Sequence, residues 1–352
     1  MTRLSDTITR IQQHLRIDAD EALQLLGEAD LMTLGHLAHE KRFLHHPEYQ
    51  VTYVKDRNIN YTNICVSGCR FCAFYKTPGQ DGGYVISQKE LGQKIAETID
   101  LGGTQILLQG GMHPDLGLDF YEDMLGFIKH TFDIHVHGFS PPEIDFIARK
   151  SHLSVADTIT RLKNAGLDSI PGGGAEILCD EIRQKVSPNK CSTAAWLEVM
   201  RQAHMAGIRS SATMMFGHLE TEAHIIQHLD RIRSLQDETG GFTAFIPWTF
   251  QPQNTRIQKE KKTGVEYLKV LALSRIFLDN IDNIQASWVT QGDKIAQTAL
   301  FFGANDMGST MIEENVVASA GVDFMLSVQE LQRLITTAGF DPRQRDCYYN
   351  LI

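Results

Sequence analysis

Short β-rich runs alternate with amphipathic helices along most of this sequence, and this alternation restricts the fold more than any other feature. Gly-rich turns separate the segments, at 102–103, 110–111, 172–174 and 240–241. Strands that alternate with helices at this spacing predict βαβ units and a parallel sheet. We expect strands at 58–63, 104–110, 133–139, 167–171, 210–216, 242–248 and 284–288, and helices near 88–101, 119–131, 154–165, 193–206, 221–237, 263–279 and 327–338.

Seven or eight such units in a chain of 352 residues favour a (β/α)8-type TIM barrel, complete or partial. An open, doubly wound sheet is the alternative. The first 50 residues instead place leucines at helical spacing after Asp18 and Asp20, up to a break at the HHP run of 45–47. We therefore expect a helical N-terminal extension at 1–50 and a β/α barrel with a C-terminal segment at 51–352.

The composition excludes several classes of protein. Apolar residues make up 42% of the chain, and the net charge of −10 argues against a protein that binds nucleic acid or an anionic membrane surface. The first residues lack the apolar core of a secretory signal, and no apolar run approaches the ~18 residues of a membrane span. Six cysteines are too few for a disulfide scaffold. We expect a soluble protein of the reducing cytoplasm.

Three closely spaced cysteines form the strongest chemical signal in the sequence. Cys65, Cys69 and Cys72 follow the first expected strand with the spacing C-x3-C-x2-C. Soft thiolate sulfur binds the iron of iron–sulfur clusters, or zinc. Three thiolates on one loop can hold three corners of a four-iron cluster, and the fourth iron is then free to bind a substrate or cofactor.

Two other uses of these thiols remain open at this point. A structural zinc site needs four ligands, and an electron-transfer cluster needs a fourth cysteine. The residues that could complete such a site are Cys179, Cys191, Cys347, His45 and His46.

The cysteine motif, with Phe71 before its last cysteine, resembles that of the radical S-adenosylmethionine (SAM) enzymes. Other segments are similar to the futalosine-pathway branch of that family, which serves menaquinone biosynthesis and is related to the synthases of the deazaflavin chromophore. Within the branch, FIPWTFQP at 245–252 and SWVTQG at 287–292 are most similar to the cyclic dehypoxanthinyl futalosine synthases, with the aminofutalosine and deazaflavin-chromophore synthases as alternatives. The resemblance covers nearly the whole chain, through DRNINYTNIC at 56–65, LLQGGMHPD at 107–115, FSPPEI at 139–144, IPGGGAEIL at 170–178, TMMFGHLET at 213–221 and GANDMGSTM at 303–311.

This resemblance implies a [4Fe–4S] cluster held by Cys65, Cys69 and Cys72, whose open iron binds SAM. Reduction of the cluster would cleave SAM and release a 5′-deoxyadenosyl radical. Relatives commonly have an acid after the glycine pair, where this chain has Met112. Backbone carbonyls would then bind the methionine ammonium. The residues expected to bind or contact SAM are Phe71, Phe74, Gly110, Gly111, Ser140, Glu176 and Arg183.

The resemblance also implies a reaction and partners. A radical would form at C4′ of the ribose of dehypoxanthine futalosine, attack the benzoate ring of the same molecule and close a spiro ring. A flavodoxin- or ferredoxin-type protein would supply the electron, and a homodimer is one assembly that the sequence leaves open. A non-catalytic iron–sulfur electron carrier and a zinc-stabilised barrel with hydrolytic or lyase chemistry are the competing functions.

Loops after the strands build the active site of a barrel, so residues after the later strands are candidates for the substrate pocket. Trp248 offers an aromatic wall for the benzoate ring. His135 and His137 alternate on one strand, which favours a hydrogen-bonded pair that lines the barrel over a metal-binding pair. The residues expected to contact the substrate are Trp248, Gln251, Ser287, Thr290 and Asn305.

The reaction also needs a group that accepts a proton and a cation for the benzoate carboxylate. Glu143, His218 and Asp293 are the candidates for the proton acceptor, although Glu143 could equally cap a helix start. The candidate cations are Arg209, Arg275 and Lys294.

Overall fold

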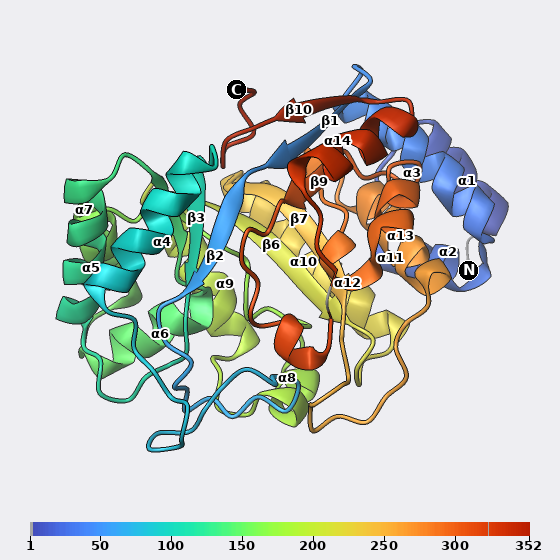
Figure 1. The fold of residues 1–352 in the computed structure, drawn as a ribbon. Coiled ribbons are helices and arrows are strands. Elements are labelled where there is room, and N and C mark those ends of the chain that lie inside the picture. Colours follow the sequence, from blue (N-terminus) through green and yellow to red (C-terminus); the bar gives the residue numbers. More distant parts are fainter. Residues whose placement is uncertain (1–2, 323) are drawn as a thin grey trace.

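Seven parallel strands form the central sheet, in the order β2-β3-β4-β5-β6-β7-β8 (Figure 1). This computed structural model describes residues 3–322 and 324–352. All seven expected strands are present, each within a few residues of its expected range. Their bounds are β2 Asp56–Asn60, β3 Gln105–Gln109, β4 His135–Gly138, β5 Ser169–Ile170, β6 Arg209–Phe216, β7 Phe242–Thr249 and β8 Asn283–Ile284.

A further strand, β9 (Asp306–Ser309), closes the sheet into a ring. On one side the amide of Ala286, just beyond β8, donates to the carbonyl of Asp306 over 2.8 Å. On the other side the amide of Thr310 donates to Val54, at the end of β1 (Gln50–Val54), which leads directly into β2. Backbone hydrogen bonds therefore run around the whole ring. The prediction of a TIM-type barrel is confirmed, and the open sheet is not what forms.

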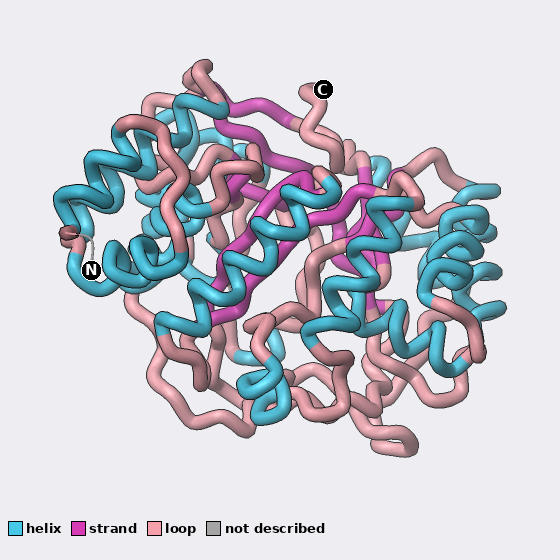
Figure 2. Tube along the Cα trace, turned by 180° about the vertical axis from the view of Figure 1, so that it is seen from behind, coloured by secondary structure: helices cyan, strands magenta, loops and turns pink. Residues whose placement is uncertain are grey.

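Helices surround this ring and connect its strands (Figures 1 and 2). Ser87, Ser154, Ser192 and Ser327 each accept a hydrogen bond from an amide in the first turn of the helix that follows, so polar caps set where the expected helices begin. The helices after β2 are α4 Gln88–Asp100, α5 Leu118–Thr131, α6 Pro141–Lys150, α7 Val155–Ala165, α8 Asp180–Val186, α9 Thr193–Met205, α10 Glu222–Thr239, α11 Gly264–Phe277, α12 Trp288–Gln291, α13 Asp293–Ala299, the 3-10 helix η1 Ala318–Ala320 and α14 Val328–Thr337.

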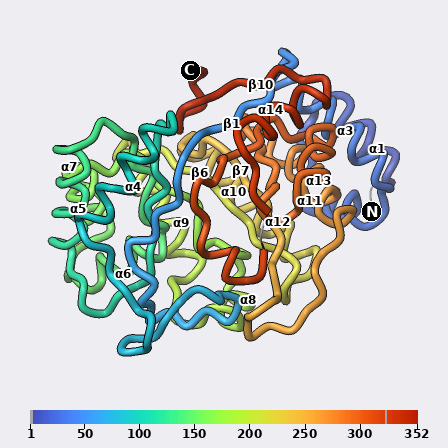
Figure 3. Tube along the Cα trace, viewed as in Figure 1, coloured from blue at the N-terminus to red at the C-terminus, as the bar shows by residue number. Residues whose placement is uncertain are grey.

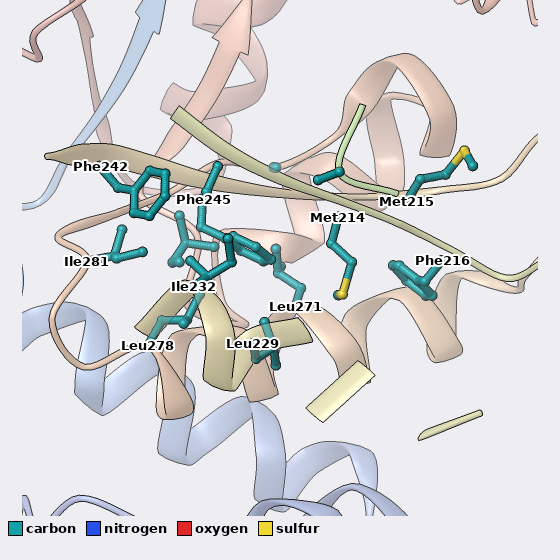
Figure 4. Packing of buried hydrophobic residues seen from close by; sticks show 14 of the residues in the cluster. Met214, Met215, Phe216, Leu229, Ile232, Phe242, Phe245, Leu271, Leu278 and Ile281 are labelled. Carbon is teal, nitrogen blue, oxygen red and sulfur yellow. The ribbon is translucent and has the colours of Figure 1, made fainter. Parts of the chain in front are cut away.

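The outer face of β6 and β7 packs against α10 and α11 (Figure 4). Phe245 and Met214 from the strands and Leu229 and Leu271 from the helices are fully buried there. Burying side chains of this size contributes roughly 1.5–3 kcal/mol each to folding. This apolar layer holds the helices in place, and the polar side chains of the same strands face the barrel interior.

Three N-terminal helices cover one side of the barrel: α1 Leu4–Gln12, α2 Ala19–Glu28 and α3 Leu31–His45. Helix α3 packs on α11, and Arg233 of α10 donates to the carbonyl of Ile17 over 2.9 Å. His45 and His46 contact Asp282 at the base of β8, with His46 Nε2 2.9 Å from its carbonyl. These two histidines are therefore bound away from the cysteine loop.

The C-terminal segment covers the end of the barrel opposite to the cysteine-bearing loop (Figure 3). Strand β10 (Asp341–Gln344) pairs with β1, and the chain then crosses the barrel floor. Arg345 donates to both carboxylate oxygens of Asp306, over 2.6 and 2.9 Å, and both side chains are buried. Burial alone would lower the pKa of Arg345, but the charge of Asp306 and these hydrogen bonds raise it above its ordinary value.

Replacing Arg345 with alanine should lower the free energy of unfolding by about 3–5 kcal/mol, because the buried carboxylate of Asp306 would lose the cation that pairs with it. Arg343→Ala is the matched control, since Arg343 lies two residues before Arg345, on β10, and is exposed. It should change stability by less than about 0.5 kcal/mol. Denaturant unfolding followed by circular dichroism measures both. Equal stability of the two variants would show that the ion pair does not hold the floor.

Candidate active site

The loop that follows β2 carries the three cysteines and is held by backbone amides. The amides of Ser67 and Met112 donate to Sγ of Cys65 over 3.4 and 3.3 Å, and Ser67 Oγ lies 2.8 Å from Sγ of Cys69. All six cysteines of the chain are free thiols. Burial raises the pKa of the three loop thiols, and nearby amides, the Ser67 hydroxyl and the Lys190 ammonium act against that rise. The loop thus supplies the donors that stabilise thiolate sulfur.

The glycine pair after β3 lets this strand end approach the cysteine loop closely. A Cβ on Gly111 would lie 2.2 Å from the carbonyl oxygen of Ile64, and a Cβ on Gly110 would lie 2.5 Å from the ring of Tyr61. Neither contact is tolerable, so both positions require glycine. Phe71 and Phe74 are half-buried on the same loop.

An ion cluster that the sequence did not reveal lies beside the thiols. Lys190 Nζ lies 2.9 Å from Oε1 of Glu176 and 5.1 Å from the centre of the Phe71 ring. Burial disfavours its charge, but the Cys69 thiol and Glu176 raise the pKa of Lys190 above its ordinary value. Lys190 comes 118 positions after Cys72 with no local motif, so no sequence signal marks it.

Arg183 supports this cluster from α8. Its guanidinium donates to the carbonyls of Ala175 and Cys191, over 2.7 and 2.8 Å, and lies 3.5 Å from Glu176. The side chain is 3% exposed. Arg183 therefore anchors the two segments that carry Glu176 and Lys190, through the carbonyls of the residues next to them.

The donor set fits an iron–sulfur cluster better than a single metal ion. Within residues 3–322 and 324–352, no three His, Cys, Asp or Glu side chains converge on a point where they could share one metal ion. The thiols that could have completed a zinc site lie elsewhere: Cys191 contacts Arg183, and Cys347 lies on the barrel floor beside Ser169. A four-iron cluster binds each thiolate through a different iron, so its ligands need not meet at one point.

A cavity of about 290 Å³ occupies the barrel interior. Side chains of β2, β3, β4, β6 and β7 line it, together with the loop after β8, the 314–317 segment and the C-terminal segment. Its size is near the lower end of the range of ligand pockets, which is roughly 300–1,000 Å³. Three of the expected substrate residues line the cavity, namely Trp248, Ser287 and Thr290.

The side chains of two other expected substrate residues form hydrogen bonds to neighbouring protein groups instead. Asn305 accepts from Arg275 over 2.6 Å and donates to Asn283, and Gln251 donates to the carbonyl of Thr249. Neither lines the cavity in the described part of the chain. The candidate cations Arg209, Arg275 and Lys294 do not line it either.

The candidates for the proton acceptor take up structural positions. Both oxygens of Glu143 are occupied, by Tyr61 Oη, the Gly110 amide and the amide and hydroxyl of Ser140, so the acid and Ser140 form a capping box that starts α6. His218 contacts the Met215 carbonyl through Nε2 and the Leu219 amide through Nδ1. Asp293 begins α13, and none of the three lines the cavity among the described residues.

Comparison with known proteins supports the same architecture and chemistry. A model of the radical SAM superfamily matches residues 59–232, and a model described as the CofH/MqnC C-terminal region matches residues 239–352. A relative from Halalkalibacterium halodurans, named cyclic dehypoxanthine futalosine synthase, is 46% identical over 96% of this chain and 92% of its own length. A relative of the same name from Streptomyces coelicolor is 44% identical over 95% of this chain and 85% of its own length.

A relative from Methanosarcina acetivorans has a different name, 5-amino-6-(D-ribitylamino)uracil–L-tyrosine 4-hydroxyphenyl transferase 1. It is 43% identical over 95% of this chain and 90% of its own length. Among solved structures, the hydrogenase maturase HydG from Carboxydothermus hydrogenoformans has a TM-score of 0.77 at 17% identity, over 98% of this chain and 80% of its own. Methylornithine synthase (PylB) has a TM-score of 0.73 at 16% identity, over 96% and 97%. At these identities the two structures support the fold alone.

The chain belongs to the radical SAM superfamily and is a radical SAM enzyme, in the branch that carries the CofH/MqnC C-terminal region. Enzymes of this superfamily use a [4Fe–4S] cluster and SAM. This membership excludes the two competing functions, a non-catalytic electron carrier and a zinc-stabilised barrel. No helix in the described residues is both long and apolar enough to cross a membrane.

Replacing Cys69 with alanine should remove most of the iron that the protein retains after anaerobic purification, because one of three expected ligands is lost. Iron content per chain and the visible absorbance of the cluster measure the effect. Cys179→Ala is the matched control, since Cys179 is also buried but lies outside the loop. It should keep the iron, and both variants should keep their circular dichroism spectrum. A Cys69→Ala protein with full iron content would contradict the ligand assignment.

Proposed function

We propose that this enzyme converts dehypoxanthine futalosine to cyclic dehypoxanthine futalosine, a step of menaquinone biosynthesis. The observation that carries the proposal is the 46% and 44% identity, over nearly the whole chain, to two relatives with that named activity. The match includes both the barrel and the C-terminal region, which together form the cavity. The relatives named as 4-hydroxyphenyl transferases, at similar identity, make a radical transfer to a ribitylaminouracil the second candidate.

The cysteine loop and its neighbours would hold the cofactors. Cys65, Cys69 and Cys72 would bind the cluster, and Phe71, Phe74, Gly110, Gly111 and Ser140 would lie around SAM. When bound, the cluster and SAM supply the 5′-deoxyadenosyl radical that would remove hydrogen from C4′ of the ribose. Glu176 is already paired with Lys190, so it would orient that ammonium as well as accept from the cofactor. Arg183, whose donors are taken up by backbone carbonyls, would act by holding this loop.

The cavity would orient the substrate and keep water away from the radical. Trp248 would form a wall for the aromatic ring, and Ser287 and Thr290, whose hydroxyls lie 2.9 Å apart, would hydrogen-bond polar groups near the mouth. After ring closure, loss of a proton would restore the aromatic ring, and the oxidised cluster would supply the acceptor for the one electron that must also leave. A closed barrel suits this chemistry, because a carbon radical reacts with almost any C–H bond that it can reach.

The electron would come from a flavodoxin- or ferredoxin-type protein that docks beside the cysteine loop. Two exposed arginines lie there: Arg70 donates to the carbonyl of Lys185 over 3.2 Å, and Arg256 donates to that of Gly68. Because the whole chain carries a net charge of −10, this local positive charge is suited to an acidic partner.

The decisive experiment is mass analysis after the reduced holoenzyme is incubated with SAM and dehypoxanthine futalosine. We expect 5′-deoxyadenosine and a cyclic product that has lost two hydrogen atoms from the substrate. The parallel incubations contain 5-amino-6-(D-ribitylamino)uracil with L-tyrosine, and the precursors of aminodeoxyfutalosine. Turnover in one of these and not with dehypoxanthine futalosine would replace the proposal with the corresponding activity.

A further inference from the structure

The deep end of the cavity is polar, although the ring of strands around it is apolar on its outer face. We call Asp56, Asn58, Gln105, His137 and Ser309 the polar floor. Strand register places Asp56 opposite Gln105, and Leu107 opposite both Asn58 and His137. All five residues of the polar floor line the cavity, directly above the C-terminal segment.

Two carboxamides of the polar floor are buried without full hydrogen bonding. Asn58 is 5% exposed, its Oδ1 has no partner, and the described part of the chain offers its Nδ2 none. Gln105 is 4% exposed and donates to Asp56 over 2.9 Å, but its Oε1 also has no partner within residues 3–322 and 324–352. A buried polar group without a partner destabilises the fold, so its presence beside a cavity indicates a ligand that completes the bonding.

His137 adds a neutral ring nitrogen to the polar floor. Its Nδ1 lies 2.6 Å from Oγ of Ser169, and within the described residues Nε2 has no hydrogen-bond partner. Burial lowers the pKa of His137 to about 3, so the ring carries no charge at neutral pH.

The charges around the cavity exclude an anion from the polar floor. Arg345 is the one arginine or lysine among the described residues that line the cavity, and each of its three nitrogens donates to the protein, two to Asp306 and one to the carbonyl of Asp346. Asp56 contributes a carboxylate close by, which accepts from Ser309. The benzoate carboxylate would therefore meet an acid and no free cation. Hydroxyl groups, which both donate and accept, match this set of residues.

We propose that the polar floor is a subsite for the hydroxyl-bearing end of the substrate, a sugar or polyol, and that the aromatic end points toward Trp248. The identity of the sugar-bearing substrate rests on the proposed function. The chemistry of the subsite does not, because a ribitylaminouracil presents hydroxyl groups as well.

Binding to the unreduced holoenzyme, with cluster and SAM present, tests the proposal without turnover. The probes are dehypoxanthine futalosine and a 3-acylbenzoate that lacks the sugar. Asn58→Leu should weaken binding of the sugar-bearing probe about tenfold, the loss expected for one buried hydrogen bond, and leave the Kd of the sugarless probe unchanged. Asn164→Leu is the matched control, since Asn164 is exposed on α7. It should change neither Kd.

Thermal unfolding distinguishes weaker binding of the sugar-bearing probe from a folding defect in the variant. Because the side chain of Asn58 bonds to none of the described residues, Asn58→Leu should not lower the Tm of the ligand-free protein. Gln105→Met provides a second variant with the same expected pattern of binding. Equal weakening for both probes, or no weakening for the sugar-bearing one, would overturn the subsite.

The same measurement distinguishes failure of the subsite from failure of the proposed function. A wild-type enzyme that binds 5-amino-6-(D-ribitylamino)uracil through Asn58, and not dehypoxanthine futalosine, would remove the proposed function and keep the subsite. An enzyme that converts dehypoxanthine futalosine, but whose Asn58→Leu variant binds it normally, would keep the function and overturn the subsite. Binding of neither compound would overturn both.

Discussion

The buried ion pair between Arg345 and Asp306 is the interaction on which the rest of the barrel depends. Asp306 belongs to β9, the strand that closes the ring, and its carboxylate also accepts from Thr52 of β1 over 2.5 Å. Arg345 begins the segment that covers the barrel floor. One carboxylate thus joins the closing strand, its neighbour and the floor, and this closes the barrel at the end opposite to the cysteine loop. A reaction that must exclude water needs a cavity that is closed in this way at one end.

The end of the barrel beside the cysteine loop is assembled from segments that lie far apart in the sequence. The cysteine loop after β2 receives an amide hydrogen bond from the loop after β3, and Asn189 donates to the carbonyl of Ser67 over 3.2 Å. The loop after β3 can come this close to the cysteine loop because Gly111 has no side chain. Lys190 then brings a positive charge next to sulfur, because Glu176 and Arg183 hold its surroundings in place. A cluster bound here would meet a preformed, positively charged shell.

Periodicity in the sequence was enough to find the seven central strands and most of the helices, because their apolar faces repeat at regular intervals. It missed β9, whose four residues Asp306–Ser309 include a glycine and an aspartate and show no apolar alternation. It also assigned Asn305 and Gln251 to the pocket. Position after a strand indicates which end of the barrel a residue occupies, but not whether its amide faces the cavity or bonds to a neighbouring segment.

The sequence by itself indicated the class of chemistry, because three thiols within one short loop stay close to one another in any fold. It also determined the parallel β/α architecture, which follows from local alternation. Only the tertiary structure decided that Lys190 lies beside the thiols, that Arg345 is paired with Asp306, and that Asn58 and His137 line the same cavity. Those facts depend on strand register and on closure of the ring, which bring together residues with no pattern in common along the chain.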